Sequence, residues 1–305
     1  MEYQLSDYQT TVETAVLGLA ERFRTPPMLH DESFVYSETL DAELAESGFH
    51  EVSTDPELGL QTAALVTMEI AKLPVCVEVA ASTMVRPQFF PEVPRPIALA
   101  DRTNRPIRFL PQAKTLVLIE DGAVKTLELA PSDVTPIASL FAYPYGRLSS
   151  EALDRAVARD VDANALRRQW QVAIAAEIWA ALDGGLALTI DYVTQRKQFG
   201  QPIGAFQAVK HRLAEVAVLS HTLKWLTLRA ASNDAPEDAL IACGYAQDAA
   251  TQAAHELHQF HGATGMTLEY PLHLWSYRLK ALVSELGGAD TQTAALADAL
   301  WGAAA

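Results

Sequence analysis

Three long stretches of helical periodicity in the second half of the chain constrain the fold more than any other feature. Apolar residues recur along them three or four positions apart, which is the spacing of one face of an α-helix. These stretches are residues 163–192, 204–232 and 235–261. Small residues such as Ala175 and Ala176 let neighbouring helices approach closely. With a fourth helix expected over residues 270–286, the pattern predicts an antiparallel four-helix bundle in residues 151–305.

The first ninety residues are also expected to be helical and to form a smaller N-terminal helical domain, residues 1–90. Ser6 or Asp7 can cap the first helix, and the pair of prolines after Thr25 ends it. Gly48 stands where the second helix would need a left-handed residue at its C-terminus. The expected helices are residues 7–23, 37–47 and 60–72.

Residues 91–150 differ from both flanking regions and predict a reduced middle β segment. Eight prolines fall within residues 91–145. A β-like run over residues 115–119 leads through an Asp-Gly turn into a second run over residues 123–129, which is the pattern of a hairpin. The rest of the segment is expected to be irregular. The predicted fold class is therefore mainly α.

The composition excludes several classes of function. Lys and Arg number 23 against 38 Asp and Glu, and a net charge of −15 opposes sequence-independent binding to nucleic acid or to an anionic membrane. Cys76 and Cys243 lie far apart, so we expect two buried thiols and neither a disulfide framework nor a metal site. No run of eighteen apolar residues occurs, and the first residues lack the pattern of a secretion signal. We expect a cytoplasmic protein.

Two short segments carry the most specific pattern in the chain. The first contains Tyr192, Arg196, Phe199, Gly200, Pro202, Ile203 and Gln207. The second contains Gln259, Gly262, Gly265 and Glu269-Tyr270-Pro271. Both resemble signatures of the acyl-CoA dehydrogenase family, with Ala263 in the place of a glycine. The resemblance covers residues 163–305 and implies the family's fold, in which a helical domain, a β domain and a helical bundle follow one another.

The resemblance implies FAD as the cofactor. A guanidinium such as that of Arg196 can hold a pyrophosphate with two parallel charge-assisted hydrogen bonds, and a glycine such as Gly262 allows close approach of the backbone. In the family these motifs hold the ADP half of a flavin whose ring lies in a neighbouring subunit. The residues that the resemblance places there are Arg196, Gln198, Phe199, Gln207, Gln259, His261, Gly262 and Ala263. The alternative is a surface salt bridge at Arg196, an ordinary turn after it, and a solvated Gln259.

Two parts of the family's active site are not visible in the sequence. Residues 91–145 contain neither a Trp nor a Gly-Ser pair, which the family uses where its β domain holds the flavin ring. The family's catalytic Glu occupies one of two positions, which fall here on Leu286 and on Trp170. Glu285 is adjacent to the first position and is the fallback candidate for a base, and Glu177 lies two turns along the helix from the second.

A chain with the pyrophosphate-binding motifs but without the base resembles the small subunits of heteromeric (α2β2) bacterial acyl-CoA dehydrogenases that act on CoA thioesters of steroid side chains. The resemblance implies a larger acyl-CoA dehydrogenase subunit as partner, an acyl-CoA or steroid-CoA substrate, and an electron-transfer acceptor. Two alternatives remain open. One is a self-sufficient homo-oligomeric acyl-CoA dehydrogenase that uses Glu285 as its base, and the other is a flavin-free structural or regulatory subunit.

Overall fold

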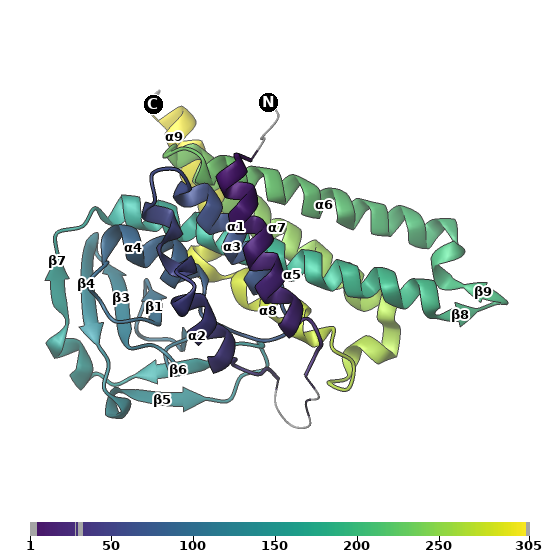
Figure 1. The fold of residues 1–305 in the computed structure, drawn as a ribbon, viewed down its shortest axis with the longest axis horizontal. Helices are drawn as coiled ribbons and strands as arrows, with labels where there is room; N and C mark the ends of the chain where they lie inside the picture. Colours follow the sequence, from purple (N-terminus) through teal and green to yellow (C-terminus); the bar gives the residue numbers. More distant parts are fainter. Residues whose placement is uncertain (1–4, 28, 30–32, 303–305) are drawn as a thin grey trace.

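The computed structural model describes residues 5–27, 29 and 33–302, and in it a helical part, a β part and a bundle of longer helices follow one another (Figure 1). The N-terminal helices are α1 (Asp7–Ala20), α2 (Glu38–Glu46), α3 (Gly59–Ala71) and α4 (Arg86–Phe89), with the short helical turns η1 (Glu21–Phe23), η2 (Phe49–Thr54) and η3 (Ala81–Val85) between them. Residues 1–4, on which part of the N-terminal signal argument rests, lie outside the described residues.

Two predicted helix ends in the N-terminal part are confirmed, the start of α1 and the end of α2, whereas α1 ends at Ala20 and not at residue 23. The Ser6 hydroxyl accepts a hydrogen bond from the Gln9 amide at 3.2 Å, and the Gln9 side chain accepts one from the Ser6 amide at 3.0 Å, which is a capping box. Gly48 follows α2 with φ +73°, the left-handed conformation that glycine adopts without a Cβ penalty. Local side-chain and backbone chemistry therefore sets these boundaries.

Five helices form the C-terminal bundle: α5 (Ala163–Gln195), α6 (Gln207–Ala231), α7 (Pro236–His261), α8 (His273–Leu282) and α9 (Gly288–Trp301). Four of them correspond to the predicted bundle, and α9 packs along α7 as an addition. The predicted helix over residues 270–286 is wrong at its end, because Leu286 has φ +51° and Gly287 has φ +92°. Positive φ at two successive residues cannot continue a right-handed helix, so the chain turns before α9.

Helix α5 is the centre of the bundle and contacts α3, α6, α7 and α8. By length and composition it could cross a membrane, with a mean hydropathy of 1.5 over its most apolar stretch. However, 78% of that stretch is buried inside the protein, which is the environment of a core helix.

The middle segment contains more β structure than the predicted hairpin. Its strands are β1 (Ile97–Ala100), β2 (Ile107–Arg108), β3 (Thr115–Glu120), β4 (Ala123–Glu128), β5 (Val134–Ile137), β6 (Tyr145–Leu148) and β7 (Val157–Arg159). They form one sheet in the order β1-β3-β4-β7 and another in the order β2-β6-β5. The hairpin is confirmed, because β3 and β4 pair antiparallel from Thr115↔Glu128 to Glu120↔Ala123.

The prolines do not prevent the additional strands, and their positions explain why. Pro96, Pro106 and Pro144 directly precede strands, where a missing amide proton costs no ladder hydrogen bond. Pro136 lies in β5, which is an edge strand of its sheet. Prolines therefore delimit these strands without preventing them, and pairing of β7 with β4 extends the β part to Arg159, beyond the predicted boundary at residue 150.

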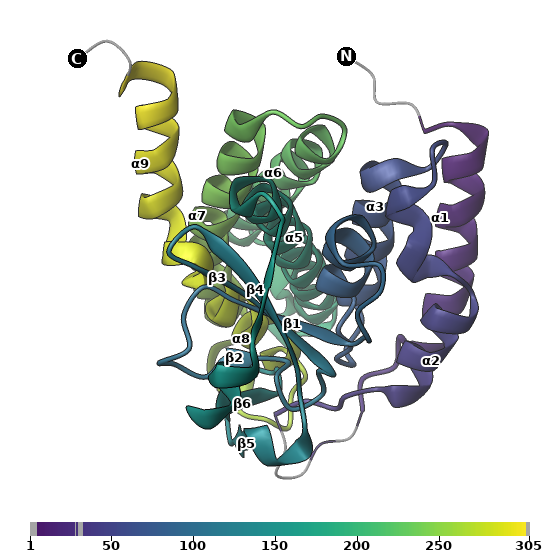
Figure 2. The same cartoon turned by 90° about the vertical axis from the view of Figure 1, so that its left-hand side faces the viewer.

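Figure 2 shows the sheets beneath the ends of the bundle helices, with α1 and α2 on one side and α9 on the other.

Side chains from α8 join the bundle to the N-terminal part. The Arg278 guanidinium donates to the carbonyls of Ala71 at 3.1 Å and Leu73 at 2.7 Å, and the Trp275 indole donates to the Lys72 carbonyl at 2.8 Å. These bonds satisfy carbonyls that the end of α3 leaves free.

Candidate functional site

The first family-like motif forms a hairpin that projects from the end of α5 and α6 (Figure 1). Its strands are β8 (Lys197–Gln198) and β9 (Gln201–Pro202). The turn residues Phe199 and Gly200 have φ +54° and φ +82°, and positive φ at both central residues matches the right-handed twist of a two-residue hairpin. The Ile203 amide closes the hairpin by donating to the Arg196 carbonyl at 2.8 Å. The Phe199 side chain is held at the tip and is 91% exposed.

The second motif forms the turn after α7. Gly262 ends the helix with φ +57° and ψ −136°, a conformation that is essentially restricted to glycine. A Cβ at this position would meet no atom within 4 Å, so the backbone conformation and not crowding requires the glycine. The following turn, η7 (Gly262–Met266), therefore has an open approach to its backbone at Gly262.

The two motifs lie at the same end of the bundle. The rings of Tyr192 and His261 pack with their centroids 4.5 Å apart, and Tyr270 contacts both rings at 5.6 and 5.0 Å. The Tyr192 hydroxyl also donates to the His261 carbonyl at 3.5 Å. Segments separated by 69 residues thus lie side by side at this end of the bundle.

Seven of the eight predicted flavin-contacting residues are exposed at this end. They are Arg196, Gln198, Phe199, Gln207, Gln259, Gly262 and Ala263. In the part of the chain that the structure describes, Arg196 forms no ion pair. The alternative of a surface salt bridge at the helix end therefore has no carboxylate to support it, and the guanidinium is available to an anion.

His261 is the exception, because its side chain does not lie on this exposed surface. The side chain is only 3% exposed, because it packs between the two tyrosines. Its Nδ1 lies 2.8 Å from the Leu257 carbonyl, which can only accept, so Nδ1 carries the proton. Burial lowers the pKa of His261 and favours this neutral form.

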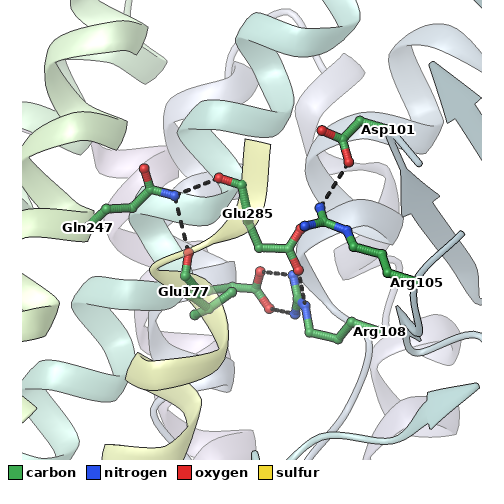
Figure 3. A network of polar contacts seen from close by, with 7 residues as sticks. Asp101, Arg105, Arg108, Glu177, Gln247 and Glu285 are labelled. Carbon is green, nitrogen blue, oxygen red and sulfur yellow. Dashed lines mark hydrogen bonds and ion pairs between the residues drawn. The ribbon is translucent and has the colours of Figure 1, made fainter. Parts of the chain in front are cut away.

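Both carboxylates that were considered as a base meet a single arginine (Figure 3). Arg108, on β2, donates to both carboxylate oxygens of Glu177, on α5, at 2.7 and 2.8 Å. Its Nε also lies 3.4 Å from Glu285. The three side chains are 10%, 3% and 14% exposed. A buried guanidinium between two carboxylates is an ion-pair cluster in which neither acid is free.

The pKa directions agree with this arrangement. Burial alone would lower the pKa of Arg108, but Glu177 and Glu285 more than offset it and hold the pKa well above its ordinary value. Burial raises the pKa of Glu285, and the charges of Arg108 and Arg105 only partly oppose that rise. Arg105 in turn pairs with Asp101 at 3.0 Å, as Figure 3 shows.

A cavity of about 350 Å³ lies between the β part and the bundle, next to this cluster. Ile107, Ile137, Phe141 and Trp170 provide apolar walls, and Glu285 lines the cavity. Trp170, on which one of the two base positions was predicted to fall, has an indole side chain, which cannot remove a proton. The other position, Leu286, is a buried hydrocarbon side chain in the turn before α9.

Arg108 was not predicted as a site residue, although a signal was present in the sequence. Arg108 lies in a short apolar run, and Glu177 lies in an Ala-rich apolar stretch of the long helix that was predicted there. Lys, Arg, Asp and Glu are almost never fully buried unless they are paired. An arginine and a glutamate that both lie in apolar segments are therefore expected to pair with each other.

Among the described residues, no group of three His, Cys, Asp or Glu side chains is placed to hold a metal ion.

Comparison with known proteins identifies similar chains. Residues 169–300 match the family model described as "Acyl-CoA dehydrogenase, C-terminal domain". The chain is 39% identical over 110 residues to acyl-CoA dehydrogenase FadE28 of Mycobacterium tuberculosis, which is 34% of this chain and 32% of that protein. It is 37% identical over 107 residues to acyl-CoA dehydrogenase IpdE2 of the same organism, which is 35% of this chain and 34% of that protein. The matches thus span about a third of each relative's length.

Two solved structures share the fold across nearly the whole chain. The steroid ACAD Tcur3481-Tcur3483 superimposes with a TM-score of 0.78 at 22% identity, over 99% of this chain and 100% of that chain. The ChsE4-ChsE5 complex from Mycobacterium tuberculosis superimposes with a TM-score of 0.78 at 21% identity, over 98% of this chain and 99% of that chain. The similarity confirms the predicted fold class, including a helical domain, a β part and a bundle in that order.

Proposed function

We propose that this chain, which belongs to the acyl-CoA dehydrogenase family through its C-terminal domain, is the cofactor-contacting and assembly subunit of a heteromeric dehydrogenase. In this role it supplies contacts to the ADP half of FAD, while a larger subunit holds the flavin ring and provides the base. The reaction is α,β-dehydrogenation of a CoA thioester. The proposal also places the protein in the cytoplasm.

The end of the bundle fits the pyrophosphate of FAD. Arg196 offers a guanidinium with no protein carboxylate beside it, and the turn at Gly262 offers backbone without side-chain cover. Phe199 adds a ring that is 91% exposed, on a hairpin that projects from the subunit. Large apolar side chains at the tip of a hairpin are typical of contact surfaces, because exposure to water alone would be unfavourable.

The observation that carries the division of labour is the bidentate ion pair between Arg108 and Glu177. A general base needs a lone pair directed at the substrate's α proton. Glu177 directs both oxygens at the guanidinium, and the family's own base positions hold Trp170 and Leu286. FAD, when bound, would supply an acceptor for the hydride of the β carbon. In this division of labour, a carboxylate of the partner would take the α proton.

Two of the structural neighbours support an assembly of unlike chains. Both Tcur3481-Tcur3483 and ChsE4-ChsE5 are named as pairs, and the first is described as a steroid ACAD. By this analogy the partner of this chain is a larger acyl-CoA dehydrogenase subunit in an α2β2 complex, its substrate is the CoA thioester of a steroid side chain, and an electron-transfer protein reoxidises the flavin. The analogy rests on fold similarity.

A self-sufficient acyl-CoA dehydrogenase is the second candidate, and one observation favours it. Glu285 lines the cavity of about 350 Å³, and burial raises its pKa, which are properties of a general base. Its contact to Arg108, at 3.4 Å, is longer than the contacts of Glu177.

Flavin content distinguishes the candidates. The chain would be purified alone and after co-expression with a larger acyl-CoA dehydrogenase chain as its candidate partner, and bound FAD would be measured by absorbance. We expect little FAD in the isolated chain and a heteromer with less than one flavin per chain. Full occupancy in the isolated chain would favour the self-sufficient enzyme, and a flavin-free complex would favour a structural or regulatory subunit.

A further inference from the structure

We infer that Tyr192 and His261 are positioning residues that hold the Arg196 hairpin and the Gly262 turn in the relative geometry that FAD requires. The inference rests on the proposed function, since it concerns the same cofactor. Neither side chain needs to touch FAD, because each acts through the backbone that carries a contacting residue. This gives buried His261 a role other than the direct contact that its position in the motif suggested.

Tyr192 is bonded to both motifs at once. Its backbone carbonyl accepts a hydrogen bond from the Arg196 amide at 2.8 Å, at the point where α5 ends and the hairpin begins. Its hydroxyl donates to the His261 carbonyl, one residue before Gly262, at 3.5 Å. Tyr192 therefore bonds to Arg196 through its backbone and to the residue before the open turn through its side chain.

His261 holds the Gly262 turn from the end of α7. Its Nδ1–H bond to the Leu257 carbonyl ties the ring to the last turn of α7. The turn closes over it so tightly that a Cβ on Gly265 would lie 2.6 Å from the His261 Cβ, closer than real side-chain carbons approach. Tyr270, which follows the turn, packs on the same ring at 5.0 Å. The imidazole is thus the packing centre of η7.

Few other contacts hold the hairpin in place. At its base, the Gly204 Cα approaches α5 so closely that a Cβ would lie 3.1 Å from the Val193 carbonyl. The tip itself is exposed from Arg196 to Gln201, and the Phe199 ring contacts the Phe206 ring with centroids 6.1 Å apart. Neither this contact nor the one at Gly204 reaches the Gly262 turn, so Tyr192 and the rings packed against it set the angle between the hairpin and the turn. A small error in this angle moves a guanidinium at the end of a long side chain by a large distance, which weakens a bidentate contact.

A double-mutant cycle tests the inference in the co-expressed complex. FAD affinity would be measured by fluorescence titration for wild type, Arg196→Ala, His261→Ala and Arg196→Ala/His261→Ala, with circular dichroism and Tm for each. We expect His261→Ala alone to weaken FAD about tenfold, and no more than about twofold when Arg196 is already absent, because the two residues act through one contact. His261→Phe keeps a ring of similar shape and should recover most of the affinity.

His255→Ala is the matched control, since His255 is an exposed histidine on the same helix, and we expect wild-type affinity from it. If His261→Ala lowers affinity equally with and without Arg196, or has no effect while Arg196→Ala does, the positioning role is wrong. If Arg196→Ala itself leaves FAD affinity unchanged, the proposed function fails instead. Should His261→Ala not fold, Tyr192→Phe decides: it removes only the hydroxyl, and a wild-type affinity for this variant would overturn the inference.

Discussion

Arg108 and Glu177 form the ion pair that connects the β part of the chain to the central helix of its bundle, with both carboxylate oxygens bonded at 2.7 and 2.8 Å. Arg108 also packs against the rings of Phe109 at 5.1 Å and Tyr143 at 4.8 Å. The guanidinium is therefore enclosed by aromatic rings and carboxylates where the β part meets the bundle. The stability of this interface should therefore depend on the ion pair.

Removing Arg108 should destabilise the fold strongly. Arg108→Leu leaves Glu177 buried without a partner, which costs about 3–5 kcal/mol of unfolding free energy. Urea denaturation followed by circular dichroism would measure it. The double variant Arg108→Leu/Glu177→Leu should recover part of the loss, since a buried ion pair can be replaced by hydrocarbon at little cost, while Glu285 stays buried without its arginine. Arg22→Ala, which breaks the exposed pair with Glu43, is the control and should cost no more than about 1 kcal/mol.

Glu285→Gln should leave the turnover of the complex within a few-fold of wild type. Gln keeps the size of the side chain and removes its capacity to accept a proton, and loss of a true general base typically lowers kcat by ~10²-fold or more. Steady-state rates with a CoA thioester would be compared at equal flavin content. A nearly inactive complex that still binds FAD would identify Glu285 as the base and favour the self-sufficient enzyme.

His50 should make the fold sensitive to acid. Burial, with help from the charges of Arg95 and Arg86, lowers its pKa to about 3, and its Nδ1 bonds the Thr83 hydroxyl at 2.9 Å. The unfolded chain binds a proton near pH 6.5, while the folded chain does not, so stability is complete above that pH and falls as the pH drops from about 6.5 towards 3. The loss approaches ~1.4 kcal/mol per pH unit. Unfolding measured at pH 7 and pH 5 should show a smaller difference for His50→Gln.

Glu78 should have the opposite pH dependence. Burial raises its pKa to about 7, although its hydrogen bond to Ser82 opposes the rise. The folded chain therefore retains a proton that the unfolded chain loses near its ordinary pKa, so this contribution is complete below about pH 4.5 and is lost as the pH rises through 7. Glu78→Gln keeps an acceptor for the Ala81 amide and should unfold at higher urea concentration relative to wild type at pH 8 than at pH 5. An equal difference at both pH values would contradict the prediction.

Structural features that depend on local chemistry or on a long hydrophobic periodicity could be predicted from the sequence. Contacts between residues far apart in the chain could not. Caps such as Ser6 and the long buried face of α5 are encoded within a few turns of helix. Strands of two to four residues, such as β2, carry too few positions for a period-two pattern and form only because another strand pairs with them. The Arg108 cluster joins residues 69 and 177 positions apart, so no local pattern contains it. The motif at Arg196 was predictable because its residues are close in the sequence.

Variants of Arg196 test whether the proposed contact to the pyrophosphate of FAD exists. Its guanidinium has no protein partner among the residues that the structure describes, so its removal should leave the bundle intact and affect only the bound anion. A charge-assisted hydrogen bond contributes about 1.5–3 kcal/mol, and Arg196→Ala should therefore weaken FAD about ten- to a hundred-fold with an unchanged Tm for the subunit. Arg196→Lys should recover only part of the affinity, because an ammonium supplies the charge but not the planar fork. Flavin retention and thermal unfolding of the three co-expressed complexes would be measured side by side. If both variants retain flavin as wild type does, the pyrophosphate is held by other groups, and the surface formed by the hairpin and the Gly262 turn has a different role.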